Sequence, residues 1–217
     1  MIRSHLRGFT LIELMICLVI IMMLSGVMLA NYPDSVIKLN LANNSHSTAL
    51  LLREAQVRGS AVDTAGGAYG GYGVYFDSAN RGYITLFGDL ISVDGPYGVK
   101  IGDGVYQGVE AGPLNETKSL LNFQDGYTFS KICVGASFPF TCGSNHTPAI
   151  TSLVVSFTRP SPQAHIYINN ATDVEFPGAC IELRTPRPGS LGHVRSVQVF
   201  TSGMIRTFIG ACDNNPS

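Results

Sequence analysis

The sequence has 217 residues, long enough for one domain of ordinary size plus an additional element. Only 13% of the residues are charged, and 14 Lys and Arg against 15 Asp and Glu give a formal net charge of -1. This balance argues against the clustered cationic surface by which nucleic-acid-binding proteins contact phosphates.

The chain begins with a basic stretch, Met1 to Gly8, which contains Arg3 and Arg7 and no acid. From Phe9 to Ala30 it is apolar over 22 residues, with a single charge at Glu13. At about 1.5 Å rise per residue, a helix of this length crosses the hydrocarbon core of a bilayer. Because the positive charges precede the helix, we expect a single pass through the cytoplasmic membrane, with everything after the helix extracytoplasmic.

The processing site also lies at this end of the chain. An ordinary secretory signal has a small-residue cleavage site after its apolar stretch, whereas here the only obvious site, Gly8, comes before it. The junction GFTLIEL, Gly8 to Leu14, resembles the signal of type IV pilins, pseudopilins and competence pilins. The resemblance extends to about Ala30 and implies that a prepilin peptidase cleaves between Gly8 and Phe9 and methylates the new Phe9 amine. An uncleaved signal anchor on an unrelated single-pass protein is the alternative.

Glu13 needs a physical account, because a carboxylate inside an apolar helix costs about 2.5 to 3.5 kcal/mol on insertion scales. One account is a carboxyl near the membrane interface, protonated or reached by water. The resemblance implies another, in which Glu13 meets the positive Phe9 amine of a neighbouring subunit during fibre assembly.

The helical pattern resumes after Pro33, where we expect a kink because proline removes one helical hydrogen bond. Apolar residues then recur as a rough stripe up to about Arg58, and Gly59 is expected to end the helix. The stripe comprises Val36, Ile37, Leu39, Leu41, Ala49, Leu52 and Ala55. The resemblance implies that this amphipathic continuation, residues 31–59, packs on a β-sheet.

Residues 60–217 are expected to form a β-rich extracytoplasmic head. It opens with a Gly-rich linker, 62–71, which lacks phosphate-loop spacing. Aromatic and β-branched runs predict strands, and short turn sequences predict hairpins at residues 77–82 and at Ser202-Gly203. The expected strands are 72–76, 83–87, 127–134, 153–158, 165–168, 180–184, 194–201 and 204–209. Asp89 to Asn115 and Thr158 to Gln163 are interpreted as loops.

The expected fold is therefore α+β: a long N-terminal helix whose second half lies on an antiparallel sheet. A second and looser resemblance, to H-type minor pseudopilins and related minor pilins, covers scattered stretches of residues 49–209, among them GYGVYFD and TSGMIRT.

Four of the five cysteines lie in the head, and Cys17 lies in the apolar helix. Outside the cytoplasm disulfides are favoured, and four cysteines allow three pairings. The residues between Cys133 and Cys142 are typical of a short turn, which favours that pair and leaves Cys180 with Cys212.

No enzymatic signature is present: the sequence has no Gly-x-Ser-x-Gly, no His-Glu-x-x-His and no Cys-x-x-Cys. We expect no catalytic residue, no cofactor and no metal, since the five histidines have no ligand spacing; they are His5, His46, His146, His165 and His193. A weaker hypothesis is calcium binding by Asp89, Asp94 and Asp103 in one Gly-rich region.

The resemblance implies a structural subunit of a type IV pilus or a type II secretion pseudopilus. The implied partners are a prepilin peptidase, an inner-membrane assembly platform driven by a cytoplasmic ATPase, membrane lipid and other pilin or pseudopilin subunits. The alternative is a DNA-binding minor pilin for DNA uptake, with Arg195 and Arg206 on phosphates. Loss of Arg3 and Arg7 with the leader, residues 1–8, would take the charge from -1 to -3, which argues against it.

Overall fold

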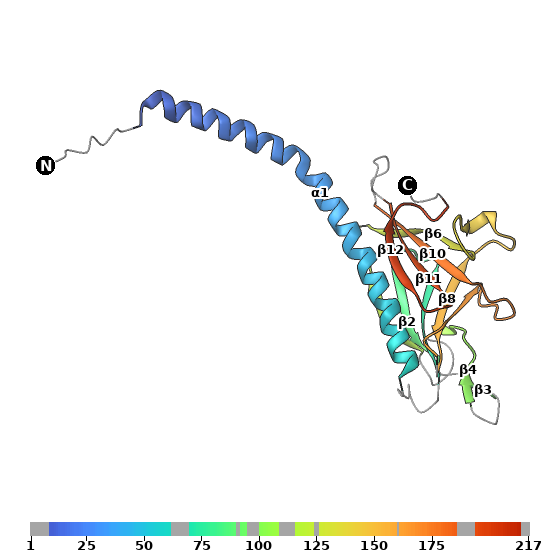
Figure 1. The fold of residues 1–217 in the computed structure, drawn as a ribbon. Helices are drawn as coiled ribbons and strands as arrows, with labels where there is room; N and C mark the ends of the chain where they lie inside the picture. The colour runs from blue at the N-terminus through green and yellow to red at the C-terminus, as the bar shows by residue number, and fades with distance from the viewer. Residues whose placement is uncertain are drawn as a thin grey trace. The chain divides into compact units, whose positions relative to one another are not determined.

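The computed structural model describes residues 9–61, 70–89, 92–94, 100–108, 116–123, 126–159, 161–185 and 194–213. The chain divides into two compact units, Met1–Leu39 and Asn40–Ser217. The first unit contains the beginning of a long helix, and the second contains the end of that helix and all of the strands (Figure 1).

The long helix, α1, runs from Leu11 to Ser60. It continues through Pro33, so the proline does not divide it into two helices. The described side chains from Leu11 to Leu29 are all exposed. The prediction of one long helix with an apolar first half is confirmed.

From Leu41 onward α1 packs into the head through one stripe of small and apolar residues. Most buried positions recur every three or four residues, as expected for one face of a helix: Leu41, Ser45, Thr48, Leu52, Ala55 and Gly59, with Ala49 and Leu51 buried beside them. Leu39 had been expected in this stripe, but its side chain is 60% exposed.

Two polar residues in this stripe satisfy their own hydroxyl groups. Ser45 donates to the carbonyl oxygen of Ala42 at 2.7 Å, and Thr48 donates to that of Asn44 at 2.9 Å. Bonding to a carbonyl three or four residues earlier removes the cost of burying an unpaired hydroxyl. The polar stretch around Ser45 therefore interrupts the apolar pattern without interrupting the helix.

Gly59 has a different role from the expected one. It lies inside α1, which ends at Ser60, and a Cβ atom at this position would be 2.3 Å from the carbonyl oxygen of Phe157. Gly59 therefore allows the helix backbone to approach a strand closely, and its position one residue before the helix end is not a C-cap.

Replacing Gly59 with alanine should lower the free energy of unfolding of the head by about 1 to 3 kcal/mol, because the clash is with backbone and cannot be relieved by a side-chain rotation. Urea unfolding of the full chain in detergent, followed by tyrosine circular dichroism, measures the change. Gly26→Ala is the matched control, since Gly26 is also helical and has nothing within 4 Å. Equal unfolding midpoints for the two variants would contradict the close approach.

The first sheet has the strand order β5-β2-β1-β8-β9, with every neighbouring pair antiparallel. Its strands are β1 (Tyr72–Asp77), β2 (Tyr83–Gly88), β5 (Thr117–Asn122), β8 (Ser152–Phe157) and β9 (Ala164–Ile168). The expected hairpin between the first two strands is confirmed, because β1 pairs with β2 through the turn between them.

The second sheet is also antiparallel, in the order β12-β11-β10-β6-β7. Its strands are β6 (Thr128–Val134), β7 (Thr141–Cys142), β10 (Gly178–Arg184), β11 (Val194–Phe200) and β12 (Ile205–Ile209). The hairpin at Ser202-Gly203 is confirmed, and Gly203 has a φ of +81°, which suits glycine.

Smaller elements depart from the expected loops. A two-stranded sheet, β3 (Ser92–Asp94) with β4 (Lys100–Gly102), lies within the segment expected to be loop, Asp89 to Asn115. Strands β5 and β7 were not predicted either, and a short 3₁₀ helix, η3 (Gly143–Asn145), follows β7.

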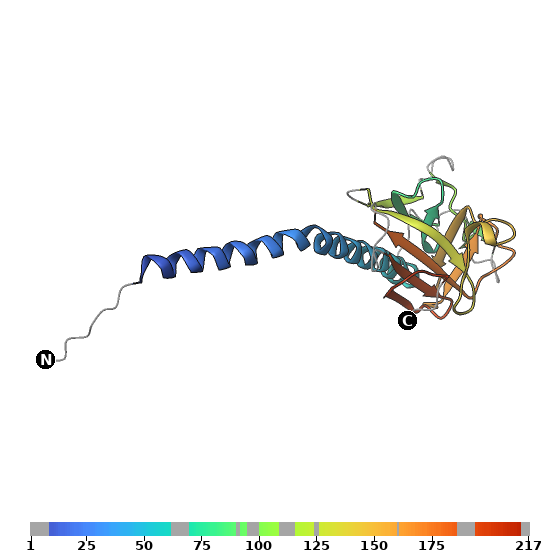
Figure 2. The ribbon, with the colours of Figure 1, turned by 90° about the horizontal axis from the view of Figure 1, so that it is seen from above.

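One hydrophobic core joins the end of α1 to strands of both five-stranded sheets. Its largest fully buried side chains include Leu52 from the helix, Phe76 and Phe157 from the first sheet, and Phe129 and Ile181 from the second. The two views of the head agree that the end of α1 lies against the strands (Figures 1 and 2). The α+β fold is confirmed, with two large sheets in the head where one was expected.

Candidate functional site

The candidate site is the start of α1, where Thr10 caps the helix. Its side-chain Oγ1 accepts a hydrogen bond from the Glu13 backbone N–H at 3.3 Å, and its carbonyl oxygen accepts one from Leu14 at 3.2 Å. Thr-x-x-Glu is the spacing of a capping box, and an acid in the first turn interacts favourably with the positive end of the helix dipole. Thr10 was not singled out from the sequence, although this spacing was visible there.

The first half of α1, up to Leu29, exposes apolar side chains that nothing in the structure covers. Its most apolar 18-residue window has a mean hydropathy of 2.6, with no part of that window buried, and α1 is long and apolar enough to cross a membrane. Side chains such as Phe9, at 79% exposed, and Met28, at 75%, would face water unless something covers them. Exposed apolar area on this scale is unfavourable in water, so this stretch favours contact with lipid or with other apolar surfaces.

A family model described as the prokaryotic N-terminal methylation motif matches residues 3–29. The chain carries the type IV pilin signal. No curated protein and no solved structure matches the chain. The matched segment contains the basic start, Gly8, Phe9, Glu13 and nearly all of the apolar stretch, so the resemblance stated from GFTLIEL is confirmed.

The signal marks a substrate of prepilin peptidase that assembles with other pilin-type subunits. It fits a membrane-anchored protein of a structural class. Gly8 lies outside the described residues, while Phe9 immediately precedes the capped helix. Cleavage between these residues, methylation of Phe9 and the pairing of Glu13 stay predictions.

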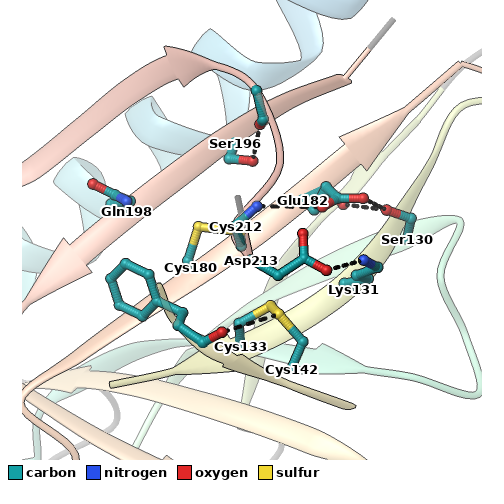
Figure 3. Close-up of a disulfide and its surroundings, with 12 residues drawn as sticks. Ser130, Lys131, Cys133, Cys142, Cys180, Glu182, Ser196, Gln198, Cys212 and Asp213 are labelled. Carbon is teal, nitrogen blue, oxygen red and sulfur yellow. Dashed lines mark hydrogen bonds and ion pairs between the residues drawn. A yellow bond between two sulfur atoms is a disulfide. The ribbon is translucent and has the colours of Figure 1, made fainter. Parts of the chain in front are cut away.

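Three of the four head cysteines lie on strands of the second sheet, and Cys212 lies in the segment after β12; the structure joins Cys133 to Cys142 and Cys180 to Cys212 (Figure 3). Cys133 is directly opposite both Cys142 on β7 and Cys180 on β10. All four are buried with Phe140, and Phe138, Phe200 and Phe208 pack against them. The two disulfides therefore lie in one aromatic cluster outside the main core.

The Cys180–Cys212 bond helps to hold the end of the described chain on the sheet. Glu182, whose side chain is fully buried, accepts hydrogen bonds from the Ser130 hydroxyl at 2.8 Å, the Arg184 guanidinium at 2.7 Å and the Cys212 backbone N–H at 3.3 Å. Next to it, Lys131 and Asp213 form an ion pair, and the hydrogen bond from Lys131 lowers the pKa of Asp213 (Figure 3). These contacts were not predicted, because all of them except the one from Arg184 join residues far apart in the sequence.

Asp89 anchors a loop in the head. Its carboxylate accepts hydrogen bonds from the backbone N–H groups of Gly104, at 2.7 Å, and Asp103, at 3.2 Å. Burial is the main reason that the pKa of Asp89 is raised to about 7; the negative charges of Asp103 and Glu116 act in the same direction, and the two backbone hydrogen bonds act against it. In the described residues no group of three or more His, Cys, Asp or Glu could hold a metal ion. The Asp94 side chain lies outside the description, so the calcium hypothesis gains no support.

The raised pKa of Asp89 gives the head a pH-dependent stability. The pKa of Asp89 is about 7 in the folded chain against a usual value of 3.8, so between pH 3.8 and pH 7 the folded state binds a proton at Asp89 that the unfolded state has lost. The contribution of Asp89 to the free energy of unfolding should therefore be fully present below about pH 4. It should be lost as pH rises through 7, by at most about 4 kcal/mol in all. Urea midpoints of the wild type and Asp89→Asn at pH 4.5 and pH 7.5 test this. The variant should show a flatter dependence, and parallel curves would contradict the assignment.

The remaining predicted residues are dispersed. The Arg206 guanidinium donates to Gln198 Oε1 at 2.5 Å and lies over the Phe200 ring, while Arg195 pairs with Ile209 across two strands. His165 contacts Glu175 at 3.1 Å, and His146 contacts the Pro148 carbonyl oxygen. His46 is exposed on α1, and His5 and His193 lie outside the described residues. The described arginines and histidines do not converge on one site.

Proposed function

We propose that this chain is a structural subunit of a type IV pilus or a type II secretion pseudopilus. Prepilin peptidase removes residues 1–8, and the mature chain assembles through its N-terminal helix. The observation that supports this most strongly is that the methylation motif at residues 3–29 includes the exposed apolar start of α1. A structural part of this kind needs no active site.

The helix has two environments in this account. Before assembly its apolar side chains lie in the cytoplasmic membrane, where a helix satisfies its own backbone hydrogen bonds. After assembly the same side chains are buried against equivalent helices in the fibre. The positive-inside bias of Arg3 and Arg7 supports an extracytoplasmic head, and so do two disulfides, which persist in oxidising compartments.

Glu13 and Phe9 are the proposed assembly residues. Cleavage exposes a positive amine at Phe9, and a carboxylate in an apolar fibre core is retained only if it is paired. Capping by Thr10 holds the first turn of the helix, including Glu13, in helical form, and so fixes the backbone position from which the Glu13 carboxylate extends. The partner amine belongs to a neighbouring subunit in this account.

The proposal is tested by shearing cells that express the full chain and the other subunits of the fibre. The mature chain should appear in the sheared fraction together with those subunits. A chain found only in membranes under all conditions would contradict assembly. A gel-shift titration of the full chain in detergent tests the DNA-binding alternative, which rests on Arg195 and Arg206 alone.

A further inference from the structure

A recess of about 460 Å³ lies on the face of the first sheet that points away from the core. Its floor is a row of side chains directly opposite one another on three strands: Tyr75, Thr85 and Leu120. Tyr83 lines it from β2, and Tyr106 and Gln107 line it from the segment after β4. The volume is within the range of small-ligand sites, about 300 to 1,000 Å³.

The wall of the recess is preformed. The Tyr106 ring lies 4.7 Å from that of Tyr75 and 5.3 Å from that of Phe87, and its hydroxyl is 2.8 Å from Thr117 Oγ1. Gln107 is held through its backbone N–H by Glu116, at 2.8 Å, and through its side-chain amide by Asp103, at 2.6 Å. A ligand would therefore meet aromatic surfaces that are already ordered, which lowers the entropic cost of binding.

The charges of the recess favour a neutral ligand. The described residues that line it include no Lys, Arg or His, so nothing there attracts a phosphate or a nucleic acid. Its acid, Asp77, already accepts hydrogen bonds from the Ala79 N–H at 2.9 Å and the Asn80 amide at 2.8 Å. The Tyr75 and Tyr106 rings contact each other and do not face each other across a gap, which disfavours an aromatic cage for a cation.

We propose that this recess is a binding site for a neutral carbohydrate. Tyrosine offers a broad apolar ring face together with a hydroxyl group, which suits the apolar C–H face and the polar rim of a sugar ring. Thr117 and Gln107 are further neutral polar residues of the lining, beside the three tyrosines. The residues of the recess come from the head and not from the apolar start of α1, and the site would let an extracytoplasmic head contact glycans outside the cell.

The test uses the full chain in a polyoxyethylene detergent, which carries no sugar headgroup. The probes are hexamers of β-1,4-linked glucose, α-1,4-linked glucose and β-1,4-linked N-acetylglucosamine. Saturation-transfer difference NMR should show transfer to the ring C–H protons of at least one probe. Tyr83→Ala should weaken that binding about tenfold, and Leu120→Asp, at a position 51% exposed, should weaken it without affecting folding.

Tyr32→Ala is the matched control, because Tyr32 is a tyrosine outside the head and 66% exposed. It should bind the probe as the wild type does. Absence of transfer to all three hexamers at millimolar concentration would overturn the proposal. So would binding that survives in both pocket variants. None of these results would bear on leader cleavage or fibre assembly.

Discussion

Replacing Gly8 with leucine should leave the leader attached and abolish the mature form of the chain. The resemblance places the cleaved bond directly after Gly8, and a residue without a side chain lets a protease approach the backbone there. We expect nearly all of the protein in membranes to retain Met1. We also expect the variant chain to be absent from the sheared fibre fraction. Intact mass measurement of the membrane-extracted chain distinguishes the two forms.

The control for this experiment is Gly26→Leu, which also adds a large side chain to a glycine near the N-terminus. Gly26 has nothing within 4 Å, so this variant should be cleaved normally. Normal processing of Gly8→Leu would contradict the proposed cleavage site, even if the chain were later found in a fibre.

Replacing Glu13 with alanine should permit membrane insertion but reduce incorporation into fibres by tenfold or more, a change of about 1.4 kcal/mol or greater. Insertion should be unaffected, since removing a charge lowers the cost of placing this helix in lipid. The measurement is the ratio of the variant chain in sheared fibres to that in membranes, relative to the wild type.

Two further variants separate the charge of Glu13 from its place in the helix cap. Glu13→Gln retains a residue that suits a capping box but removes the charge, so it should be as defective as Glu13→Ala. Thr10→Ala removes the 3.3 Å hydrogen bond from the Glu13 N–H to Thr10 Oγ1 but keeps the Glu13 charge, so its defect in fibre incorporation should be smaller. Wild-type incorporation of Glu13→Gln would show that pairing with the Phe9 amine is not required.

The parts of the fold that could be predicted are those with a strong local pattern. The apolar run before Ala30 and the hairpins around Asp77 and Gly203 each combine a clear periodicity with a definite start or turn. Strands β3, β4 and β7 have only two or three residues each, too few for alternation to show. Strand β5, TKSLLN, is an edge strand with mostly exposed side chains, so it lacks the apolar alternation of a half-buried strand.

Other features depend on contacts between distant residues. Ser45 and Thr48 look like a polar interruption of α1 until their bonds to its own carbonyl groups are seen. Gly59 looks like a helix stop because its contact, Phe157, is about a hundred residues away. In the sequence Asp89 suggests only a weak calcium hypothesis and Glu182 suggests no role, and only the folded chain brings these buried acids their backbone and side-chain donors.

The start of the helix lies between these two cases. The capping role of Thr10 is local, and the Thr-x-x-Glu spacing alone is enough to predict it. The recess beside Tyr75 could not be inferred, because its residues come from three strands and a loop that meet only in the folded head.

The most direct test is the mass of the N-terminal peptide recovered from sheared, polymerised material. The peptide should begin at Phe9 and carry one extra methyl group on its amine, while its counterpart in peptidase-deficient cells should begin at Met1. Polymer whose subunits still start at Met1 would contradict the account, because the amine that neutralises the buried acid would then not exist.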